Sequence, residues 1–516
     1  MTERRVIMGL LFYPRGGSAF VVRYLSPALT QAGWSVSLAS GSLGAPGDET
    51  NAATFFAGLD VHALDYTAAR DAFAAGGDPI AASPPMQPSY EDRAGVPDVV
   101  FASVPPERAE YLSNAWLAPL RTAGADQTDV FHLHHLTPQL DAVRQDWPHV
   151  PLVVHLHGTD LKMIEAIDER VALAAAIGET LETMATTTPV HLDAIDDLDA
   201  EQMEMLKTTR WASWRYGEFW AAHLREQARR ADQVITVSEL NRTAAISELG
   251  LDSHRVTAIA NGVDIEHFRP RPDARAARRA TFQRVLVDDP HGWSEFLPPG
   301  TLRYTAADLD RLLGPEGDAT VLLYVGRFIS FKRVPLLVRA FARARSRFTR
   351  PASLVIWGGH PGEWEGEHPV TVAAEVGSDD VYFTGWRGHE DLAVGLAACD
   401  ALIVPSVDDA YPQVPLEAMS AGLPVLAARS GGLISMVNRD PDRPTGWFVP
   451  PDDLDALAET LARVVDDPTD RAARGANALA YARAELSWDR LVPQFESVYD
   501  QAIEHRRATD PAARAS

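Results

Sequence analysis

Cysteine and long apolar runs are both scarce in this chain. A single cysteine, Cys399, among 516 residues excludes an internal disulfide framework and a cysteine-based zinc site, and it fits a reducing compartment. No apolar run reaches the ~18 to 20 residues of a membrane-spanning helix, so stable insertion into a membrane is not expected. The N-terminal RRVIMGLLFYPRGG lacks a small-residue cleavage site, and we interpret it as a first buried strand. We therefore expect a cytoplasmic protein.

Basic residues are also in short supply relative to acidic ones. The chain has 47 Lys and Arg against 71 Asp and Glu, which gives a formal net charge of -24. Such a charge opposes non-specific attraction to nucleic acid and to anionic lipid, so neither is expected as a partner. A small anionic ligand is still compatible with this charge if a few local cations receive it.

Short apolar segments alternate with stretches of helical period along the whole chain. They lack the polar alternation of half-exposed strands, which is typical of parallel strands buried on both faces. The segments read RVIMGLLFY, DVFHLHHL, PLVVHLHG, DQVITVS and RVTAIANG, and then TVLLYVGR, ASLVIWGG, DVYFTGW, ALIVPS, PVLAAR and GWFVP. Two α/β domains in tandem are predicted. Ligands of such sheets bind beyond the carboxyl ends of the strands, so we expect the domains to face each other across a cleft.

The expected domain boundaries follow from these two series and from the length of the chain, which exceeds a single core. The N-terminal domain covers 1–270 and carries insertions at about 41–105 and 161–228; a linker or insertion covers 271–319; the C-terminal domain covers 320–486; a helix at 487–507 crosses back to the N-terminal domain; and 508–516 form a mobile tail.

Two cations follow the first strand of the second series. In YVGRFISFKRVP, Gly326 ends the apolar run, and Arg327 and Lys332 come next, just before a helix whose first turn suits Pro335. Free backbone amides and the helix dipole favour an anion at such a place, and two cations indicate more charge than one carboxylate carries. A diphosphate fits. The alternative is that Arg327 pairs with an acid of the domain while Lys332 and Arg333 are solvated.

Two acids follow a later strand of the same series. The segment VPSVDDAYPQVPLEAMSAGLPVLAARSGG comes after ALIVPS and is expected to open a helix near Pro415. Glu417 would then lie in the first turn, where the helix dipole keeps its carboxylate ionised and able to accept both hydroxyl hydrogens of a ribose. Asp409 lies in the preceding loop, within reach of the same cleft. Taken alone, Glu417 is better explained as a helix-start acid that serves stability only.

As a set, these segments resemble the C-terminal domain of the retaining GT-B glycosyltransferases of family 4, the group 1 glycosyl transferases, which use nucleotide sugars. The matching segments are GRFISFKR, VYFTGWRGHEDLAVGLAACDALIVPS, PLEAMSAGLPVLA and TGWFVPPDDLDALA. The N-terminal half is similar to the family in FYPRGGSAFVVRYL, HLHGTD, TVSELNR and IANGVDIEHFRP. The resemblance implies the GT-B fold, with two Rossmann-like doubly wound domains.

The resemblance assigns the donor-binding residues. Arg327 and Lys332 match the basic pair that holds the donor diphosphate and stabilises the charge that develops on it as the sugar leaves. Glu417 matches the ribose-binding acid, and Gly17 matches a loop glycine that lets backbone amides approach the phosphates. The remaining donor-binding candidates are the backbone at Trp386 and Arg387, expected beside the base, and Tyr411, Pro412 and Gln413.

The resemblance also suggests catalytic and acceptor-side residues. His157 matches a histidine that faces the donor sugar, and Asp409 matches an acid at the sugar's ring hydroxyls, so the predicted catalytic set is these two with Arg327 and Lys332. The acceptor-side candidates are His134, His135 and Asn261. For the histidines that end the strand DVFHLHHL, packing at the strand end is the better explanation.

Some residues depart from the family pattern. Asp409 stands where the family commonly has glutamate, one methylene longer, and Asp408 is a possible substitute. Pro412 stands where some members have glycine, and Ser435 stands where glutamate is frequent. Because these positions surround the sugar, the resemblance does not imply glucose.

No metal and no cofactor are expected. The acidic triplets at 197–199 and 308–310 have a spacing that suits Mg²⁺ in a different fold, but we interpret both as chance, since the cations already neutralise the diphosphate. No protein group is assigned as nucleophile or general base.

The predicted function is a retaining glycosyltransferase that moves a sugar from a nucleoside diphosphate to a small polar acceptor, in secondary metabolism for example. The two insertions in the N-terminal domain are expected to roof the acceptor. Two alternatives stay open: a disaccharide synthase or phosphorylase on the same fold, and a nucleotide-sugar sensor without turnover. A dehydrogenase is excluded because YPRGGSAF lacks the glycine spacing of a dinucleotide-binding loop.

Overall fold

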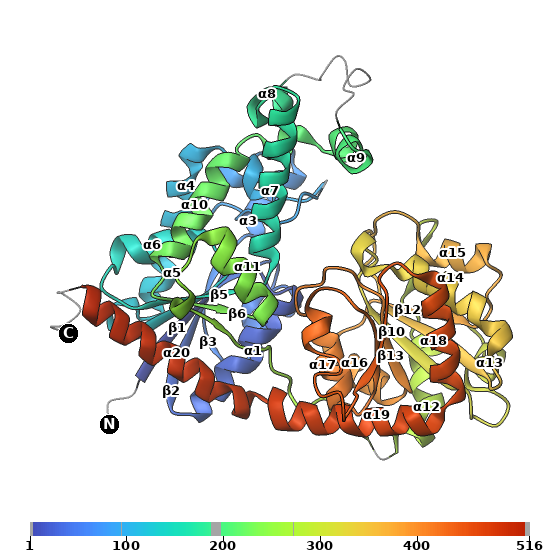
Figure 1. The fold of residues 1–516 in the computed structure, drawn as a ribbon. Coiled ribbons are helices and arrows are strands. Elements are labelled where there is room, and N and C mark those ends of the chain that lie inside the picture. The colour runs from blue at the N-terminus through green and yellow to red at the C-terminus, as the bar shows by residue number, and fades with distance from the viewer. Residues whose placement is uncertain (1–3, 94, 187–197, 272, 511–516) are drawn as a thin grey trace. The chain divides into compact units, whose positions relative to one another are not determined.

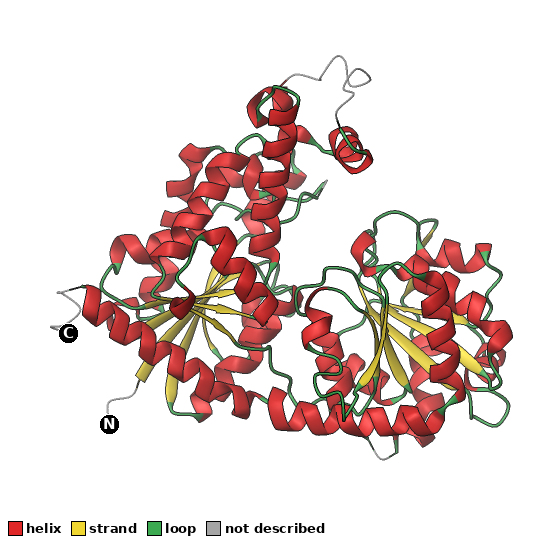
Figure 2. Cartoon of the chain, in the orientation of Figure 1, coloured by secondary structure: helices red, strands yellow, loops and turns green. Residues whose placement is uncertain are grey.

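The computed structural model of the chain describes residues 4–93, 95–186, 198–271 and 273–510 (Figure 1). The residues group into two compact units: unit 1 comprises Met1–Ala260 and Val492–Ser516, and unit 2 comprises Asn261–Leu491. Figure 2 shows that each unit is a sheet covered by helices. The predicted α/β class, with two parallel sheets, is confirmed.

Unit 1 is built on a seven-stranded sheet in the order β3-β2-β1-β4-β5-β6-β7. Its strands are β1 (Arg4–Leu10), β2 (Trp34–Ser42), β3 (Asp60–Asp65), β4 (Val130–His134), β5 (Leu152–Leu156), β6 (Gln233–Thr236) and β7 (Val256–Ala258), and neighbouring strands pair in parallel. Every residue of β4 and β5 is buried. This burial explains why these strands read as continuous apolar runs, interrupted only by histidines.

The helices of unit 1 cover both faces of this sheet. They are α1 (Gly16–Gln31), α2 (Ala52–Phe55), α3 (Thr67–Ala74), α4 (Ala109–Asn114), α5 (Leu117–Thr122), α6 (Pro138–Asp146), α7 (Thr159–Ala176), α8 (Leu181–Thr186), α9 (Ala200–Thr208), α10 (Gly217–Arg230) and α11 (Glu239–Leu249). A last helix, α20 (Trp488–Thr509), contains the boundary between the units, and its Tyr499 packs on Trp34 of β2. Most of the predicted mobile tail, 511–516, lies outside the described residues.

The two predicted insertions of the N-terminal half pack against each other. The backbone N–H of Tyr216 donates to the carbonyl of Ala102 at 2.8 Å, and the indole N–H of Trp220 donates to the carbonyl of Val104 at 2.8 Å. Trp220 is fully buried in the core of unit 1. The segments are therefore an integral part of unit 1 rather than loose additions to its surface.

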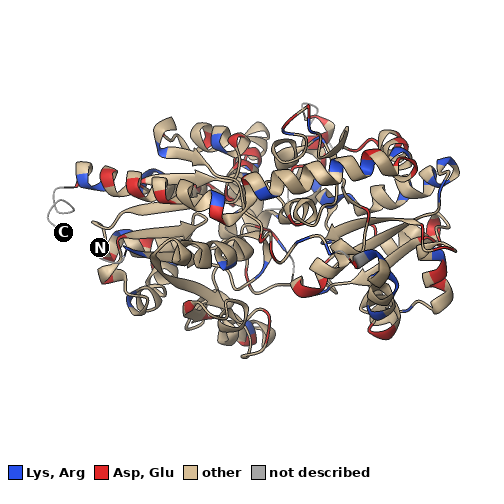
Figure 3. Cartoon of the chain, turned by 90° about the horizontal axis from the view of Figure 1, so that it is seen from below, with Lys and Arg blue, Asp and Glu red and all other residues tan. Residues whose placement is uncertain are grey.

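Unit 2 has a six-stranded sheet in the order β12-β11-β10-β13-β14-β15. Its strands are β10 (Thr320–Gly326), β11 (Ala352–Gly358), β12 (Val381–Gly385), β13 (Ala401–Val404), β14 (Val425–Ala428) and β15 (Gly446–Val449), all paired in parallel. Its helices are α12 (Ala274–Phe282), α13 (Ala306–Leu313), α14 (Val334–Ala344), α15 (Pro369–Glu375), α16 (His389–Ala397), α17 (Gln413–Ser420), α18 (Leu454–Asp466) and α19 (Pro468–Tyr481). Figure 3 shows the charged residues mainly on helices and loops.

Residues 271–319, predicted as a linker or insertion, fold with unit 2. They form α12, a π-helical turn at Gln283–Asp288, an antiparallel hairpin of β8 (Gly292–Ser294) with β9 (Leu297–Leu302), and α13. The hairpin is anchored by Trp293, which is buried and whose indole N–H donates to the carbonyl of Gly359 at 2.7 Å. The segment therefore covers the β11 and β12 side of the sheet.

Both sheets reverse their strand order at one place, between β1 and β4 in unit 1 and between β10 and β13 in unit 2. In open parallel sheets the loops that leave such a pair of strands diverge to opposite faces, and ligands bind in the crevice between them. The segments that carry most of the predicted site residues follow these strands. None of the helices in the described ranges combines the length and the apolar composition that crossing a membrane requires.

Candidate active site

The two predicted cations of unit 2 lie at the carboxyl end of β10. A single 3₁₀ turn, Ser330–Lys332, connects this strand to α14, and Pro335 occupies the first turn of that helix, as predicted. Arg327 and Lys332 are both half-buried. The hydroxyl of Tyr324 donates to the carbonyl of Arg327 at 2.9 Å, which ties the loop back to the strand.

Lys332 forms an ion pair with Asp409 of the loop after β13. The side chains are 16% and 14% exposed, so the pair is largely screened from solvent. Burial raises the pKa of Tyr324, and the nearby charge of Asp409 raises it further while that of Arg327 opposes it. Arg327 and Asp409 therefore lie near one tyrosine at the strand-order reversal of unit 2, and Lys332 is paired with Asp409.

The alternative for this stretch had Arg327 paired with an acid of the domain and Lys332 and Arg333 solvated, and the structure contradicts the part on Lys332 and Arg333. Lys332 binds Asp409, and the guanidinium of Arg333 binds both carboxylate oxygens of Asp452, at 2.5 and 3.1 Å. Arg333 also has a left-handed backbone, with φ of 53°, at the start of α14. The side chain of Arg333 thus binds Asp452.

The prediction for Glu417 was wrong in two respects. The helix begins at Gln413, with Pro412 extended before it, so Glu417 is its fifth residue and lies in the second turn. The shift arises because Pro415 is tolerated as the third helical residue, where no intrahelical N–H bond is required. The side chain is also buried, which raises the pKa of Glu417 to about 8, and its Oε2 has no hydrogen-bond partner among the described residues. Without a ligand this carboxyl is mostly protonated at neutral pH.

Two glycines fix the loop that carries Asp409. The N–H of Gly432 donates to the carbonyl of Asp409 at 2.7 Å, and a Cβ on Gly432 would lie 1.8 Å from the carbonyl oxygen of Ala410. Gly431 has φ of 53°, and a Cβ there would lie 2.5 Å from the carbonyl oxygen of Asp409. The glycine pair is therefore a packing requirement of the site.

The other departures from the family pattern lie around the same loop. Asp408, named as a substitute for Asp409, is exposed, and its N–H donates to the hydroxyl of Ser430 at 3.0 Å. The hydroxyl of Ser435 donates to the carbonyl of Gly432 at 3.1 Å. Pro412 takes the N-cap position of α17. Asp408, Ser435 and Pro412 thus each help to stabilise the loop that carries Asp409 or the start of the helix that follows it.

Tyr411, Gln413 and Asn261 lie together in unit 2. Tyr411 is buried, Gln413 is the first residue of α17, and the Nδ2 of Asn261 lies 3.5 Å from the carbonyl oxygen of Tyr411. Asn261 was predicted on the acceptor side of the N-terminal half. The structure instead places it beside the loop that carries Asp409.

Trp386 and Arg387 follow β12. Trp386 is half-exposed, whereas the guanidinium of Arg387 is buried and donates to Asp289 at 2.8 Å and to the carbonyl of Val285 at 2.9 Å. The Arg387 side chain therefore anchors the π-helical turn. The interaction predicted for these two residues uses their backbone, and the carbonyl of Trp386 is already hydrogen-bonded to the Nδ1 of His291 at 3.1 Å.

In unit 1, Gly17 lies at the N-terminus of α1, in the loop that follows β1. Gly17 is the second residue of the helix and is exposed. The neighbouring Gly16 has φ of 73°, a conformation that side chains rarely adopt. Arg15 donates to the hydroxyl of Tyr13 at 2.6 Å and pairs with Asp98. This glycine pair leaves the first amides of α1 uncovered by any side chain of its own.

The predicted histidines of unit 1 come together at the carboxyl ends of β4 and β5. The Nδ1 of His134 is hydrogen-bonded to the Nε2 of His157 at 2.9 Å. His135, with φ of 69°, is bonded through Nδ1 to Asp160 at 3.1 Å. Burial lowers the pKa of His134 and of His157 well below the ordinary value, so both imidazoles are neutral at pH 7.

Asp160 was missed as a site residue. It is buried in the first turn of α7, and burial alone would raise its pKa, but the contact with His135 and the N–H of Leu136 lower the pKa to about 2. An acid two residues after the glycine that ends HLHG is a helix-start signal, and that signal could have drawn attention to it. Its ionised carboxylate orients His135.

The acidic triplets that were interpreted as chance have structural partners where they are described. Asp308 caps α13 and Asp310 binds Arg279 at 2.7 Å, while Asp199 caps α9. Asp197 lies outside the described residues.

Two family models match the chain. The model for glycosyl transferases group 1 matches residues 308–480, and the model for glycosyltransferase family 4 matches residues 15–267. The chain belongs to the GT-B glycosyltransferases of group 1 and family 4. The first of these models spans Arg327, Lys332, Asp409 and Glu417; the second spans the histidines.

Curated relatives of this GT-B chain include D-inositol 3-phosphate glycosyltransferases. The protein of that name from Saccharomonospora viridis is 30% identical over 285 residues, which cover 54% of this chain and 58% of the relative. That from Kineococcus radiotolerans is 31% identical over 296 residues, which cover 54% of this chain and 60% of the relative. The chain thus matches less than two thirds of the length of these relatives.

Solved GT-B structures share the fold across nearly the whole chain. Sucrose-phosphate synthase from Thermosynechococcus elongatus aligns with a TM-score of 0.56 and 21% identity, covering 97% of this chain and 99% of that one. The catalytic domain of starch synthase IV from Arabidopsis thaliana, bound to ADP and acarbose, aligns with a TM-score of 0.59 and 16% identity, over 97% and 99% of the two chains. Anabaena HepE in complex with UDP aligns with a TM-score of 0.57 and 16% identity, over 96% and 99%. These likenesses concern the fold alone.

Proposed function

We propose that the protein is a retaining glycosyltransferase that moves a sugar from a nucleoside diphosphate to a small polar acceptor. The observation that carries this proposal is the convergence of Arg327, Lys332 and Asp409 at the carboxyl ends of β10 and β13, with Glu417 in the helix that follows. Two cations and two acids at the reversal of a parallel sheet suit a diphosphate and the hydroxyls of its sugar and ribose.

The ion pair of Lys332 with Asp409 suggests how the donor is received. A diphosphate oxygen would replace Asp409 as the partner of Lys332, and the freed carboxylate would accept hydrogen bonds from the sugar's hydroxyls. The pair therefore holds both groups in place before the donor arrives, at lower cost than two unpaired charges in a largely buried position.

Transfer then depends on charge stabilisation. The bond between the anomeric carbon and the phosphate oxygen breaks, its electron pair leaves with the diphosphate, and the acceptor oxygen bonds to the same face of the anomeric carbon. The departing phosphate oxygen takes the acceptor's proton, so no protein base is needed. Arg327 and Lys332 stabilise the developing charge without a metal ion, and preorganised donors of this kind contribute about 3 to 4 kcal/mol each.

Glu417 is proposed to recognise the ribose. Its unpartnered Oε2 is able to accept from a ribose hydroxyl, and ionisation allows it to accept from both. Because burial raises the pKa of Glu417 to about 8 in the free protein, binding at neutral pH would release a proton.

The acceptor is proposed to bind to unit 1. A hollow of about 550 Å³ there is lined by residues of both insertion segments, among them Asp92, Arg170 and Trp214. The curated relatives are named for an inositol phosphate acceptor, so a cyclitol or its phosphate is the first acceptor class to test. His157, as a neutral imidazole, would contribute a hydrogen bond to the transferred sugar. The single buried Cys399 agrees with a cytoplasmic enzyme.

A thermal-shift screen of nucleoside diphosphates and their sugars tests the proposal. A ligand at 100 times its Kd adds ~2.7 kcal/mol of stability, and the donor identified in this way is then incubated with a panel of cyclitols. Product with retained anomeric configuration, seen by NMR, supports the proposal. Donor binding without turnover on any acceptor would favour a sensor, and sugar release that requires inorganic phosphate would favour a phosphorylase.

A further inference from the structure

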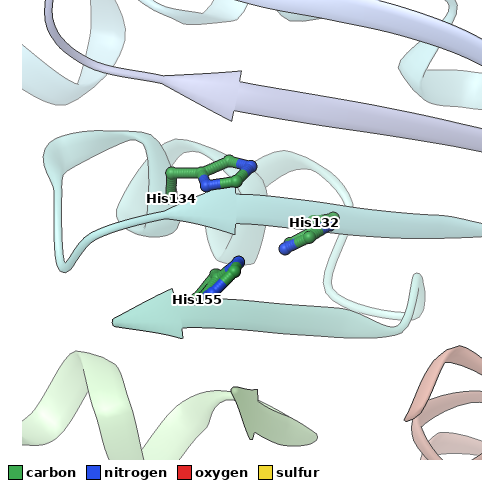
Figure 4. A group of neighbouring side chains, drawn as sticks. All are labelled: His132, His134 and His155. Atoms are coloured by element: carbon green, nitrogen blue, oxygen red, sulfur yellow. The ribbon is translucent and has the colours of Figure 1, made fainter. Parts of the chain in front are cut away.

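Three histidines of unit 1 lie on one face of the sheet, apart from the residues assigned to the donor. His132 and His134 are two positions apart on β4, and His155 of β5 is the register partner of His134. Figure 4 shows the three imidazoles near one another along β4 and β5. All three side chains are fully buried, with ring centroids 4.6 to 5.4 Å apart. Packing alone does not account for three imidazoles in one buried cluster, because burying ring nitrogens without hydrogen-bond partners costs free energy.

The nitrogens of this cluster are close enough to share one ion. One ring nitrogen from each histidine lies within 4.8 Å of the other two. Nitrogens bound to the same zinc ion, at ~2.0 to 2.1 Å each, lie at most about 4 Å apart. The imidazole planes lie at 17 to 33° to one another, so binding an ion needs rotation of the rings as well as a closer approach of their nitrogens.

In His132 and His134, hydrogen bonds distinguish a bonded nitrogen from an unbonded one. The Nδ1 of His132 is bonded to the hydroxyl of Tyr499 at 2.7 Å, and the Nδ1 of His134 is bonded to His157 at 2.9 Å. The Nε2 of both rings, and both nitrogens of His155, have no hydrogen-bond partner among the described residues. His132 and His134 thus have the arrangement of metal-bound histidines, in which the second nitrogen holds a partner that orients the ring.

The ligand chemistry of the cluster also suits a metal, because a neutral imidazole donates a lone pair to a metal ion. Three imidazoles without carboxylates favour Zn²⁺, Cu²⁺ or Ni²⁺ over Mg²⁺ or Ca²⁺, which prefer oxygen ligands.

We propose that His132, His134 and His155 bind one transition-metal ion of the zinc class, which ties β4 to β5 in the core of unit 1. The site goes beyond the proposed transferase activity, since its ligands take no part in neutralising the diphosphate. The ion is structural: it binds one otherwise unpartnered nitrogen of each ring and holds the strand ends from which His135 and His157 project.

Metal binding by the wild-type protein is the first test. The protein is dialysed against chelator, loaded with Zn²⁺, freed of excess metal and analysed by mass spectrometry for zinc; Co²⁺ loading provides a visible absorption spectrum. We expect about one equivalent of metal, a low-coordinate Co²⁺ spectrum and a higher Tm for the loaded form. Fewer than about 0.1 equivalents, with no change in Tm, would overturn the proposal.

Variants locate the ion. His155→Gln is expected to reduce bound zinc at least about tenfold, and Tyr499→Phe to weaken binding about 10- to 100-fold by removing the partner of His132. His149→Gln, which changes an exposed histidine paired with Asp510, is the control and is expected to keep full binding. Zinc retained at one equivalent in His155→Gln would also overturn the proposal. Circular dichroism verifies the fold of each variant, and the wild-type result stands even if one variant fails to fold.

Discussion

The two units have their candidate site residues at equivalent positions in the sheet, but these residues differ in charge. Both sheets reverse their order beside their first strand, and in both the candidate residues lie in the segments that leave the strands at this reversal. In unit 2 these residues are the half-buried Lys332 and Asp409 pair with Arg327 beside it, whereas in unit 1 they are neutral, buried imidazoles. The topology fixes where a ligand binds, and the side chains decide what kind of ligand it is.

The difference in charge separates the proposed tasks. Unit 2 has cations with counterions that a diphosphate can replace. Unit 1 has histidines whose burial keeps them uncharged, with Asp160 as an ionised neighbour of His135. The comparison implies that removing charge from unit 2 disables donor binding, while removing imidazoles from unit 1 changes acceptor handling and stability.

The largest expected effect comes from Arg327→Ala. Removing one preorganised cation should lower kcat about 10²- to 10³-fold, because the diphosphate's developing charge loses a stabilising partner. Steady-state kinetics with the identified donor measures it. Arg339→Ala, on the solvent side of α14 and paired with Glu367, is the matched control and should keep kcat within about twofold. Equal losses in both variants would mean that the effect is not specific to the site.

Glu417→Gln should weaken nucleoside diphosphate binding by about 10- to 100-fold, the value of a hydrogen bond to a charged group. The wild-type affinity should rise from pH 6 to pH 8, because binding requires the carboxylate and burial raises the pKa of Glu417 to about 8 in the free protein. Isothermal titration at several pH values measures both. A wild-type affinity that is flat with pH would show that Glu417 does not ionise on binding.

Asp409→Asn should lower kcat by about 10- to 100-fold, through loss of the charged acceptor for the sugar's hydroxyls. Binding of a nucleoside diphosphate without sugar should be unchanged or tighter, because Lys332 then has no competing carboxylate. Asp409→Glu restores the acid common in the family and should retain activity. Weaker nucleotide binding in Asp409→Asn would instead mean that Asp409 positions Lys332.

The smallest effect concerns stability without ligand. The pKa of Glu417 is about 8 in the folded protein and ordinary in the unfolded chain, so the unfolded chain loses this proton first as pH rises. The contribution of the Glu417 carboxyl to the free energy of unfolding is therefore fully present below pH ~4.5. This contribution is lost progressively up to pH ~8, where the folded form ionises too. Glu417→Gln should have a Tm advantage over wild type that is larger at pH 8 than at pH 4.5 in differential scanning calorimetry.

Short-range patterns in the sequence predicted the fold and the position of Arg327 and Lys332 between β10 and α14. Glycine at the end of a strand, then Arg327, Lys332 and a proline in the next helix, are local signals, and the structure agrees with them. The start of α17 was misplaced because two prolines, Pro412 and Pro415, both suit the first positions of a helix.

Contacts between distant residues could not be predicted from the sequence in this way. Lys332 and Asp409 are 77 positions apart, and His135 and Asp160 are 25 apart, so only the folded sheets bring them together. The raised pKa of Glu417 is likewise a consequence of burial by surrounding elements, which its position in a helix does not reveal.

The most direct measurement is isothermal titration of UDP, GDP and ADP into the wild type, Arg327→Ala and Glu417→Gln at pH 8. The account predicts that at least one nucleotide binds the wild type with 1:1 stoichiometry and binds each variant at least about tenfold more weakly. Equal affinity in all three proteins, or no binding of any nucleotide to the wild type, would contradict it.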